Sequence, residues 1–262
     1  MKRYLGLAHL TALELTPAEL INTAAAAGYD GVGLRLIPVV GQAFPHAPLD
    51  LPAIERAVKE TGLRIYDIEV FRLEAQTRVA DFEPMLEISQ RLGATELLVH
   101  GADPDVARLT ETFGALCDLA ARYRLFASLE PMPWVDVSNM AKALRVIEGA
   151  GRPNGALLVD AIHFFRGGNR PADLKEVPTQ RLRYMQFTDA RAEVPNNMQE
   201  MIRQARGDRL FPGEGGLDLR GLLEALPADL PISLEIPYAK PMPALERVRR
   251  AISATKAMLD AR

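Results

Sequence analysis

The chain has 262 residues, of which 48% are hydrophobic and 25% are charged, so a disordered, collagenous or coiled-coil protein is excluded. A net charge of -3 at pH 7 does not provide the basic surface that nucleic-acid binding needs, and no uncharged apolar run reaches the roughly 18 residues of a membrane span. Cys117 is the only cysteine, which excludes a disulfide framework and fits a reducing compartment. We therefore expect a cytoplasmic protein that binds neither nucleic acid nor membranes.

Short apolar runs recur along the whole chain. They are rich in Leu, Val and Ile and too short for helices, so we expect them to be strands. Because the runs are nearly continuous rather than alternating, the strands should be buried on both faces, as parallel strands covered by helices are. The runs cover residues 4–8, 31–37, 64–70, 96–99, 125–129, 156–159, 182–187 and 231–236.

Helical patterns fill the intervals between these runs. Thr16 and Asp50 stand directly before the first two patterns and Asp103 shortly before the third, and short polar side chains there can accept the free N–H groups of a first helical turn. Glycines follow several helices, where a left-handed residue ends the helix most easily. The patterns cover residues 17–27, 51–60, 106–123 and 138–149, and the glycines are Gly28, Gly62, Gly93 and Gly151.

Eight strand–loop–helix units of about 30 residues each predict a (β/α)8 TIM barrel. We expect a single domain over residues 1–262. The alternative, a doubly wound open sheet, usually carries a glycine-rich phosphate turn after its first strand, and residues 7–11 contain no glycine. The long interval between residues 187 and 231 is expected to form an active-site lid with a helix near 198–205.

Polar side chains recur at the expected carboxyl ends of the strands, where TIM barrels build their active sites. Glu130, Asp160, Gln186 and Glu235 stand at the ends of strands five to eight and should converge at the mouth of the barrel. Three ionised carboxylates in one place repel one another unless a cation lies between them. These four residues are therefore the predicted ligands of a divalent metal ion.

The same stretches resemble the xylose isomerase-like TIM barrel superfamily, also called the sugar phosphate isomerase/epimerase family. The resemblance spans essentially the whole chain and implies a metal held by residues of the strand ends. Many relatives have a histidine where this chain has Gln186, and many have a glutamate at the position of Gly33, which Arg35 follows here. The matching stretches are residues 26–32, 128–131, 159–163, 186–190, 212–215 and 233–236.

The second half of the chain is similar to bacterial 3-dehydroshikimate dehydratases in particular. These proteins share the stretches 186–190, 212–219 and 233–236 and a Phe-Arg pair like the one that ends at Arg72. Hydroxypyruvate isomerases share the glutamine ligand. An oxygen-rich ligand set favours Mn(II), Mg(II) or Co(II), with Zn(II) as a further candidate.

The predicted site also contains groups that move protons. Glu130 and Glu235 could each bind the metal through one oxygen and transfer a proton with the other, from opposite faces of the substrate. His163 could donate a proton to a leaving hydroxyl, although a histidine beside two phenylalanines could equally be a packing residue. In the turn that contains Glu214, we expect this acid to bind backbone amides rather than perform chemistry.

Five further residues are candidates for substrate binding. An arginine can hold a carboxylate or phosphate through paired hydrogen bonds, whereas most surface arginines are only solvated. The histidine at the end of strand four could instead bond a neighbouring loop, and the single tryptophan could instead be a core or interface residue. The candidates are Arg72, His100, Trp134, Arg191 and Arg209.

The leading function is a metal-dependent isomerase or epimerase of a small polyhydroxy carbonyl compound, which works by proton abstraction through an enediolate. The alternative is a lyase of the 3-dehydroshikimate dehydratase type. A carboxylate-binding arginine in the pocket would distinguish the lyase, because a neutral ketose does not need one. A DNA-repair endonuclease and a ligand binder without catalysis fit the residues less well. The expected partner is a small-molecule substrate, and a homo-oligomer is compatible with the sequence.

Overall fold

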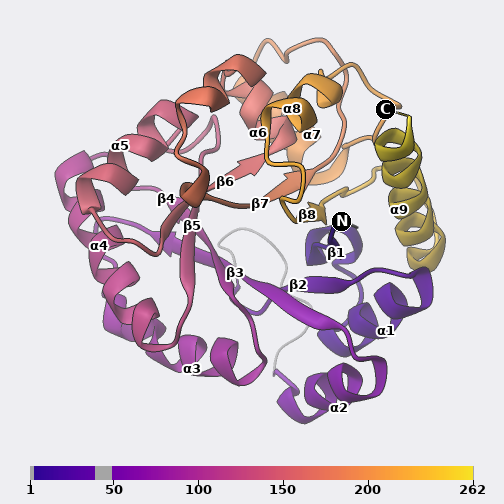
Figure 1. Cartoon of the computed structure of the whole chain (residues 1–262), viewed down its shortest axis with the longest axis horizontal. Coiled ribbons are helices and arrows are strands. Elements are labelled where there is room, and N and C mark those ends of the chain that lie inside the picture. The colour runs from indigo at the N-terminus through magenta and orange to yellow at the C-terminus, as the bar shows by residue number, and fades with distance from the viewer. Residues whose placement is uncertain (1–2, 39–48, 262) are drawn as a thin grey trace.

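A computed structural model describes residues 3–38 and 49–261, which form a closed barrel of eight strands. Each strand pairs in parallel with its neighbours in chain order, and the last strand pairs back to the first. Figure 1 looks along the barrel, with the strands at the centre and the helices around them. The predicted TIM barrel is confirmed. The strands are β1 (Leu5–Leu7), β2 (Gly31–Arg35), β3 (Arg64–Leu73), β4 (Glu96–Gly101), β5 (Phe126–Glu130), β6 (Gly155–Asp160), β7 (Leu182–Phe187) and β8 (Ile232–Leu234).

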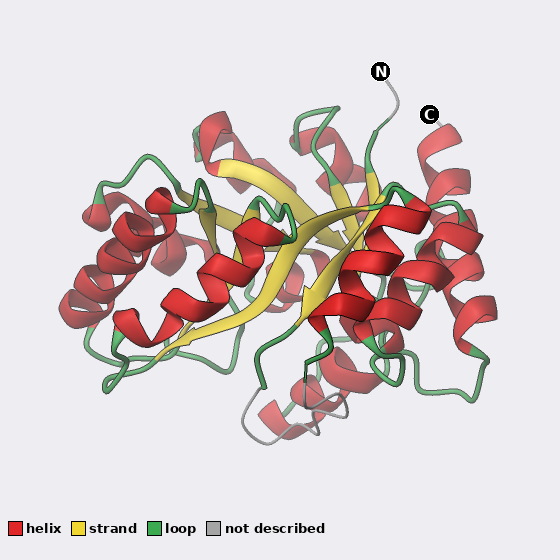
Figure 2. Cartoon of the chain, turned by 90° about the horizontal axis from the view of Figure 1, so that it is seen from below, coloured by secondary structure: helices red, strands yellow, loops and turns green. Residues whose placement is uncertain are grey.

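The helices form the outer layer of the barrel, which Figure 2 shows from the side with helices flanking the strands. No helix in the described part of the chain has the length and apolar content needed to cross a membrane. Short 3-10 turns add η1 (His9–Ala12), η2 (Val79–Phe82), η3 (Pro171–Glu176) and η4 (Thr179–Arg181). The α-helices are α1 (Pro17–Ala27), α2 (Leu51–Thr61), α3 (Glu83–Arg91), α4 (Val106–Arg122), α5 (Met140–Ala150), α6 (Ala161–Arg166), α7 (Met198–Gly207), α8 (Leu219–Ala225) and α9 (Ala244–Asp260).

Local sequence explains where the helices begin and end. The Thr16 hydroxyl accepts the Glu19 N–H at 3.3 Å, and the Glu19 carboxylate accepts the Thr16 N–H at 2.8 Å, so α1 begins with a capping box. Gly28 ends the same helix with a φ of 81°, a conformation that costs a glycine little.

The start of α4 differs from the prediction. Its N-cap is Asp105, which accepts two N–H groups of the first turn, whereas Asp103 accepts the Asp105 N–H at 2.9 Å and pairs with Arg108 at 2.6 Å. Asp103 therefore positions the capping residue and does not cap the helix itself.

The two faces of the barrel strands pack in different apolar clusters. Side chains alternate along a strand, and on β5 Ala127 and Leu129 pack in the main core that also contains the helix faces. Ser128 and Glu130 belong to the opposite face and point into the barrel. The barrel interior has its own small apolar cluster, which includes Tyr66, Leu98 and Tyr184. The strands are buried on both faces, as the continuous apolar runs predicted.

Candidate active site at the mouth of the barrel

A cavity opens at the carboxyl ends of the strands. Its apolar lining consists of Leu10, Val70, Leu98, Met132, Trp134 and Ala205. Its polar lining combines acids, neutral bases and cations, and the residues are Arg35, Arg72, His100, Glu130, His163, Arg206, Arg209 and Glu235. A cavity with an apolar body and convergent polar groups is the usual form of a small-molecule site.

The four predicted metal ligands lie together at this end of the barrel. Glu130 and Asp160 are the last residues of β5 and β6, Gln186 lies in β7, and Glu235 directly follows β8. All four are buried, with at most 3% of the residue exposed. The Gln186 amide donates to Glu235 Oε1 at 3.0 Å. The structure thus brings together the residues that the strand ends placed at one edge.

Arg209 lies between two of these carboxylates. Its guanidinium donates to Asp160 Oδ2 at 2.7 Å and pairs with Glu235 Oε2 at 2.8 Å. Its Nε donates to the Ala205 carbonyl at 2.7 Å, and only 1% of the residue is exposed. Because these donors are engaged inside the protein, Arg209 balances the charge of the carboxylates. It also lines the cavity, where the sequence predicts a contact with substrate.

Burial and charge shift the pKa values of the three acids in different directions. Burial raises the pKa of Glu130 well above its ordinary value, and the Asp160 charge raises it further. Burial also raises the pKa of Glu235, although Arg209 opposes this effect. Burial opposes ionisation of Asp160 as well, but Arg209 and His163 hold its pKa below the usual range. Two of the three acids would therefore gain from another cation.

Two buried oxygens of this group are available for a metal ion. Glu130 Oε1 and Gln186 Oε1 have no hydrogen-bond partner within residues 3–38 and 49–261, and buried polar atoms rarely lack one. Glu130, Asp160 and His163 each offer a ligand atom within 4.8 Å of the others. Carboxylate, amide and imidazole donors suit a divalent cation. The residues therefore fit the predicted metal, and the geometry adds His163 to the candidate ligands.

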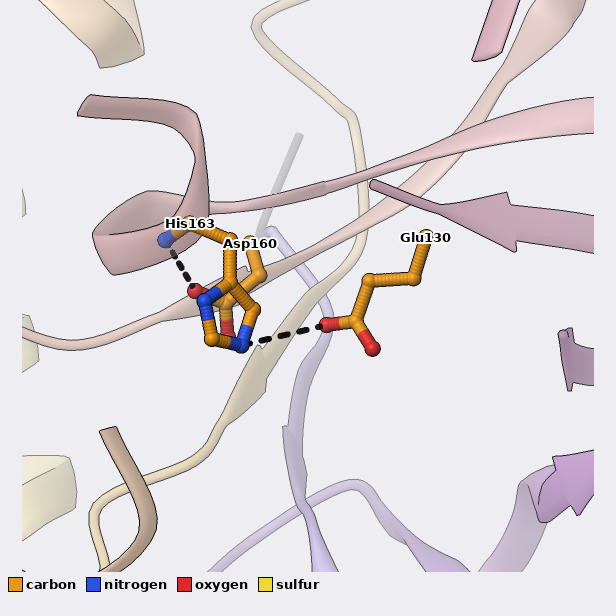
Figure 3. Close-up of side chains that lie close together, drawn as sticks. All are labelled: Glu130, Asp160 and His163. Carbon is orange, nitrogen blue, oxygen red and sulfur yellow. Dashed lines mark hydrogen bonds and ion pairs between the residues drawn. The ribbon is translucent and has the colours of Figure 1, made fainter. Parts of the chain in front are cut away.

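His163 lies in the first turn of α6, the helix that directly follows β6. Its backbone N–H donates to Asp160 Oδ1 at 3.0 Å, and its Nε2 lies 4.0 Å from Glu130 Oε1 (Figure 3). Trp134 meets the imidazole edge to face, with 4.9 Å between the ring centroids. Burial is the main cause that lowers the pKa of His163 to about 3. The imidazole is therefore neutral at neutral pH, and one of its ring nitrogens carries no proton.

His100 contacts the other oxygen of the same glutamate. Its Nε2 lies 2.7 Å from Glu130 Oε2, and burial, followed by the charges of Arg35 and Arg72, lowers its pKa to about 3. A neutral imidazole with its proton on Nε2 would donate to the carboxylate. His100 thus orients one oxygen of Glu130 and leaves the second oxygen facing His163.

The lid is anchored by an acid that the sequence analysis did not single out. Asp189 Oδ2 accepts the N–H groups of Gly213 and Gly215 at 3.0 Å, and its Oδ1 accepts from Leu217 at 3.2 Å. Glu214 instead pairs with a side chain of α9, Arg250, at 2.5 Å. The expected role of Glu214 in binding backbone amides therefore belongs to Asp189, three residues after Gln186.

Of the other two arginines predicted to bind substrate, one lines the cavity and the other does not. Arg72 lines the cavity and pairs with Glu74 at 2.6 Å. Arg191 is absent from the lining and pairs with Asp208 at 2.8 Å, with its side chain 49% exposed. Two arginines that do line the cavity, Arg35 and Arg206, were not among the sequence candidates. Arg35 ends β2, so its strand-end position was a usable signal, whereas Arg206 on α7 carried none.

The family model described as xylose isomerase-like TIM barrel matches residues 21–258 of this chain. The chain belongs to that family. A curated relative named 3-dehydroshikimate dehydratase, from Pseudomonas aeruginosa, is 27% identical over 237 residues. The match covers 84% of this chain and 36% of the relative, so the chain spans about a third of that protein's length.

Other members of the similar set carry different activities in their names. An inosose isomerase of Bacillus velezensis is 24% identical over 158 residues, which are 56% of this chain and 54% of that protein. The solved structure of the IolI protein with a zinc atom superposes with a TM-score of 0.78 at 19% identity, and the match covers 98% of each chain. At this identity the superposition establishes the shared fold.

Proposed function

We propose that the chain is a divalent-metal-dependent lyase that removes water from a small cyclic hydroxy-keto acid such as 3-dehydroshikimate. The observation that carries the proposal is the arginine side of the cavity, where Arg35, Arg72 and Arg206 face the same space as Glu130 and Glu235. A substrate that bears a carboxylate needs such cations, and a neutral ketose does not. The dehydratase relative supports the same choice.

Different residues of the site would bind the metal and transfer the protons during an elimination of water. A divalent cation held by Glu130, Asp160, Gln186 and Glu235 would polarise the substrate carbonyl and acidify the neighbouring C–H. His163 or Glu130 accepts that proton, since the imidazole is neutral and lies 4.0 Å from the free carboxylate oxygen. The hydroxyl on the next carbon leaves as water with a proton returned from the same pair. Loss of one further proton from a ring carbon and gain of one by the former carbonyl oxygen then complete the aromatic product. Atoms balance as one substrate to one aromatic acid plus one water.

A second candidate, an isomerase or epimerase, rests on the two glutamates. Glu130 and Glu235 both line the cavity, from strands five and eight, so one acid can remove a proton and the other can return it from a different side. An epimerase needs this pair, whereas the elimination can use a single base.

One assay separates the two candidates. Purified protein is loaded with Mn(II) and incubated with 3-dehydroshikimate, and the aromatic product is followed by absorbance. In parallel, deuterium uptake from solvent is measured in a panel of ketoses and hydroxypyruvate. We expect aromatic product. Deuterium uptake by a ketose without loss of water, and no aromatic product under any metal, would reject the lyase in favour of the second candidate.

A further inference from the structure

The cations of the cavity differ in how their charge is balanced. Arg35 pairs with Glu69 at 3.0 Å, and Arg72 pairs with Glu74 at 2.6 Å. Arg209 pairs with the carboxylates of Asp160 and Glu235. Arg206 differs from all three. No hydrogen bond or ion pair joins the Arg206 guanidinium to another residue within the described ranges.

Arg206 nevertheless faces the other arginines. It lies in the last turn of α7, next to Ala205 in the cavity lining. Partial burial, followed by the charges of Arg35 and Arg72, lowers the pKa of Arg206. The charges of all three arginines also lower the pKa of His100. Like charges that face one cavity are unfavourable unless an anion offsets them. Arg206 therefore adds a positive charge to this side of the cavity that a negative ligand would balance.

The charges and the apolar lining of the cavity indicate which kind of anion would bind beside Arg206. Because Arg35 and Arg72 already have carboxylate partners, the uncompensated charge at this side is the single charge of Arg206. One excess charge matches a carboxylate better than a phosphate dianion. Apolar side chains such as Leu98, Met132 and Trp134 also line the cavity that contains the arginines and the carboxylates. Such side chains suit the flat faces of a cyclic substrate.

We propose that Arg206 binds the carboxylate of the substrate, with Arg35 and Arg72 beside it, and makes the site selective for an acid over its neutral analogue. This inference rests on the proposed function, which supplies a ring acid as substrate. It assigns the anchoring role to an arginine of the lid, whereas the sequence pointed to Arg72. Arg206 is thereby a specificity-determining residue, and proton transfer remains with Glu130 and His163.

The test compares two probes that differ only in charge, 3,4-dihydroxybenzoate and 3,4-dihydroxybenzamide. Their binding is measured by titration calorimetry with the full chain, with and without Mn(II). We expect the wild-type chain to prefer the acid by at least about tenfold, as one charge-assisted hydrogen bond would give. Arg206→Gln should abolish most of this preference, and Arg206→Lys should keep part of it.

Arg203→Gln is the matched control, because Arg203 lies on the same helix and pairs with Glu200 and Asp208 on the surface. It should keep the preference. An unchanged preference in Arg206→Gln, or an equal loss of both probes, would overturn the inference, and competition by inorganic phosphate stronger than by the benzoate would assign the subsite to phosphate. A chain that binds the acid through Arg206 but forms no product from 3-dehydroshikimate would leave the inference standing and remove the lyase proposal.

Discussion

Each end of the barrel interior contains a buried glutamate, but the two glutamates differ in how their carboxylate oxygens are hydrogen-bonded. At the amino-terminal end, Glu96 accepts from Arg183 at 3.0 Å and from Ser128 at 3.0 Å, and the Arg183 guanidinium also covers the Phe126 ring at 3.8 Å. At the mouth, Glu130 keeps one buried oxygen without a partner among the described residues. The difference teaches that burial of an acid does not mark a site; an acceptor left unused next to a cavity does.

The first prediction concerns a glutamate at the mouth of the barrel. Glu130→Gln should lower kcat/KM by at least about 10²-fold because it removes a proton acceptor and a metal ligand, while the melting temperature changes little. The comparison variant is Glu96→Gln at the other end, which should lower the melting temperature and leave activity within a few fold. Full turnover in Glu130→Gln would remove the assigned role of this glutamate.

The second prediction concerns the buried cation of the mouth. Arg209→Gln leaves Asp160 and Glu235 facing each other without their guanidinium, which should cost roughly 3–5 kcal/mol of stability. A divalent ion can replace the missing charge, so Mn(II) should raise the melting temperature of the variant more than that of the wild-type chain. Equal Mn(II) shifts in both proteins, measured by scanning calorimetry, would contradict this account of Arg209.

The third prediction tests the middle of the barrel, where Gly33 faces Asp67. A Cβ on Gly33 would lie 2.5 Å from one Asp67 oxygen and 2.6 Å from the other, so Gly33→Ala should destabilise the fold by about 1–3 kcal/mol. The double variant with Asp67→Ala should cost less than the sum of the single changes, because the clashing oxygens are gone. Additive losses in urea unfolding would show that the two positions do not interact.

The smallest expected effect depends on pH. Asp67 is fully buried, and neither of its oxygens has a partner within the described chain. Burial is the main cause that raises its pKa well above the ordinary value, and the charge of Glu69 adds to it. The native state therefore binds this proton more tightly than the unfolded state, so the contribution of Asp67 to stability falls as pH rises above its unfolded value of about 4.

Asp67→Asn removes this titration. The variant should melt a few degrees higher than the wild-type chain at pH 8 and gain less at pH 4.5, which thermal melts at the two pH values can measure. Gains of the same size at both pH values would mean that ionisation of Asp67 is not what the substitution relieves.

Local sequence determined the elements of this protein and the edge at which its acids meet. Apolar runs and caps such as Thr16 and Gly28 specify strands and helix ends through neighbouring residues only. In a parallel barrel, every strand that ends in a polar residue delivers it to the same face. Glu130, Asp160, Gln186 and Glu235 could therefore be placed together without any knowledge of packing.

The tertiary structure alone decided what surrounds those acids. Arg209 and Arg206 come from one stretch of the lid, yet one is buried among carboxylates and the other lies at the arginine side of the cavity. Asp189, rather than Glu214, holds the lid turn. These outcomes depend on how a long connection folds back over the barrel, which is set by contacts between residues far apart in the chain, and no local pattern of caps or periodicity encodes them.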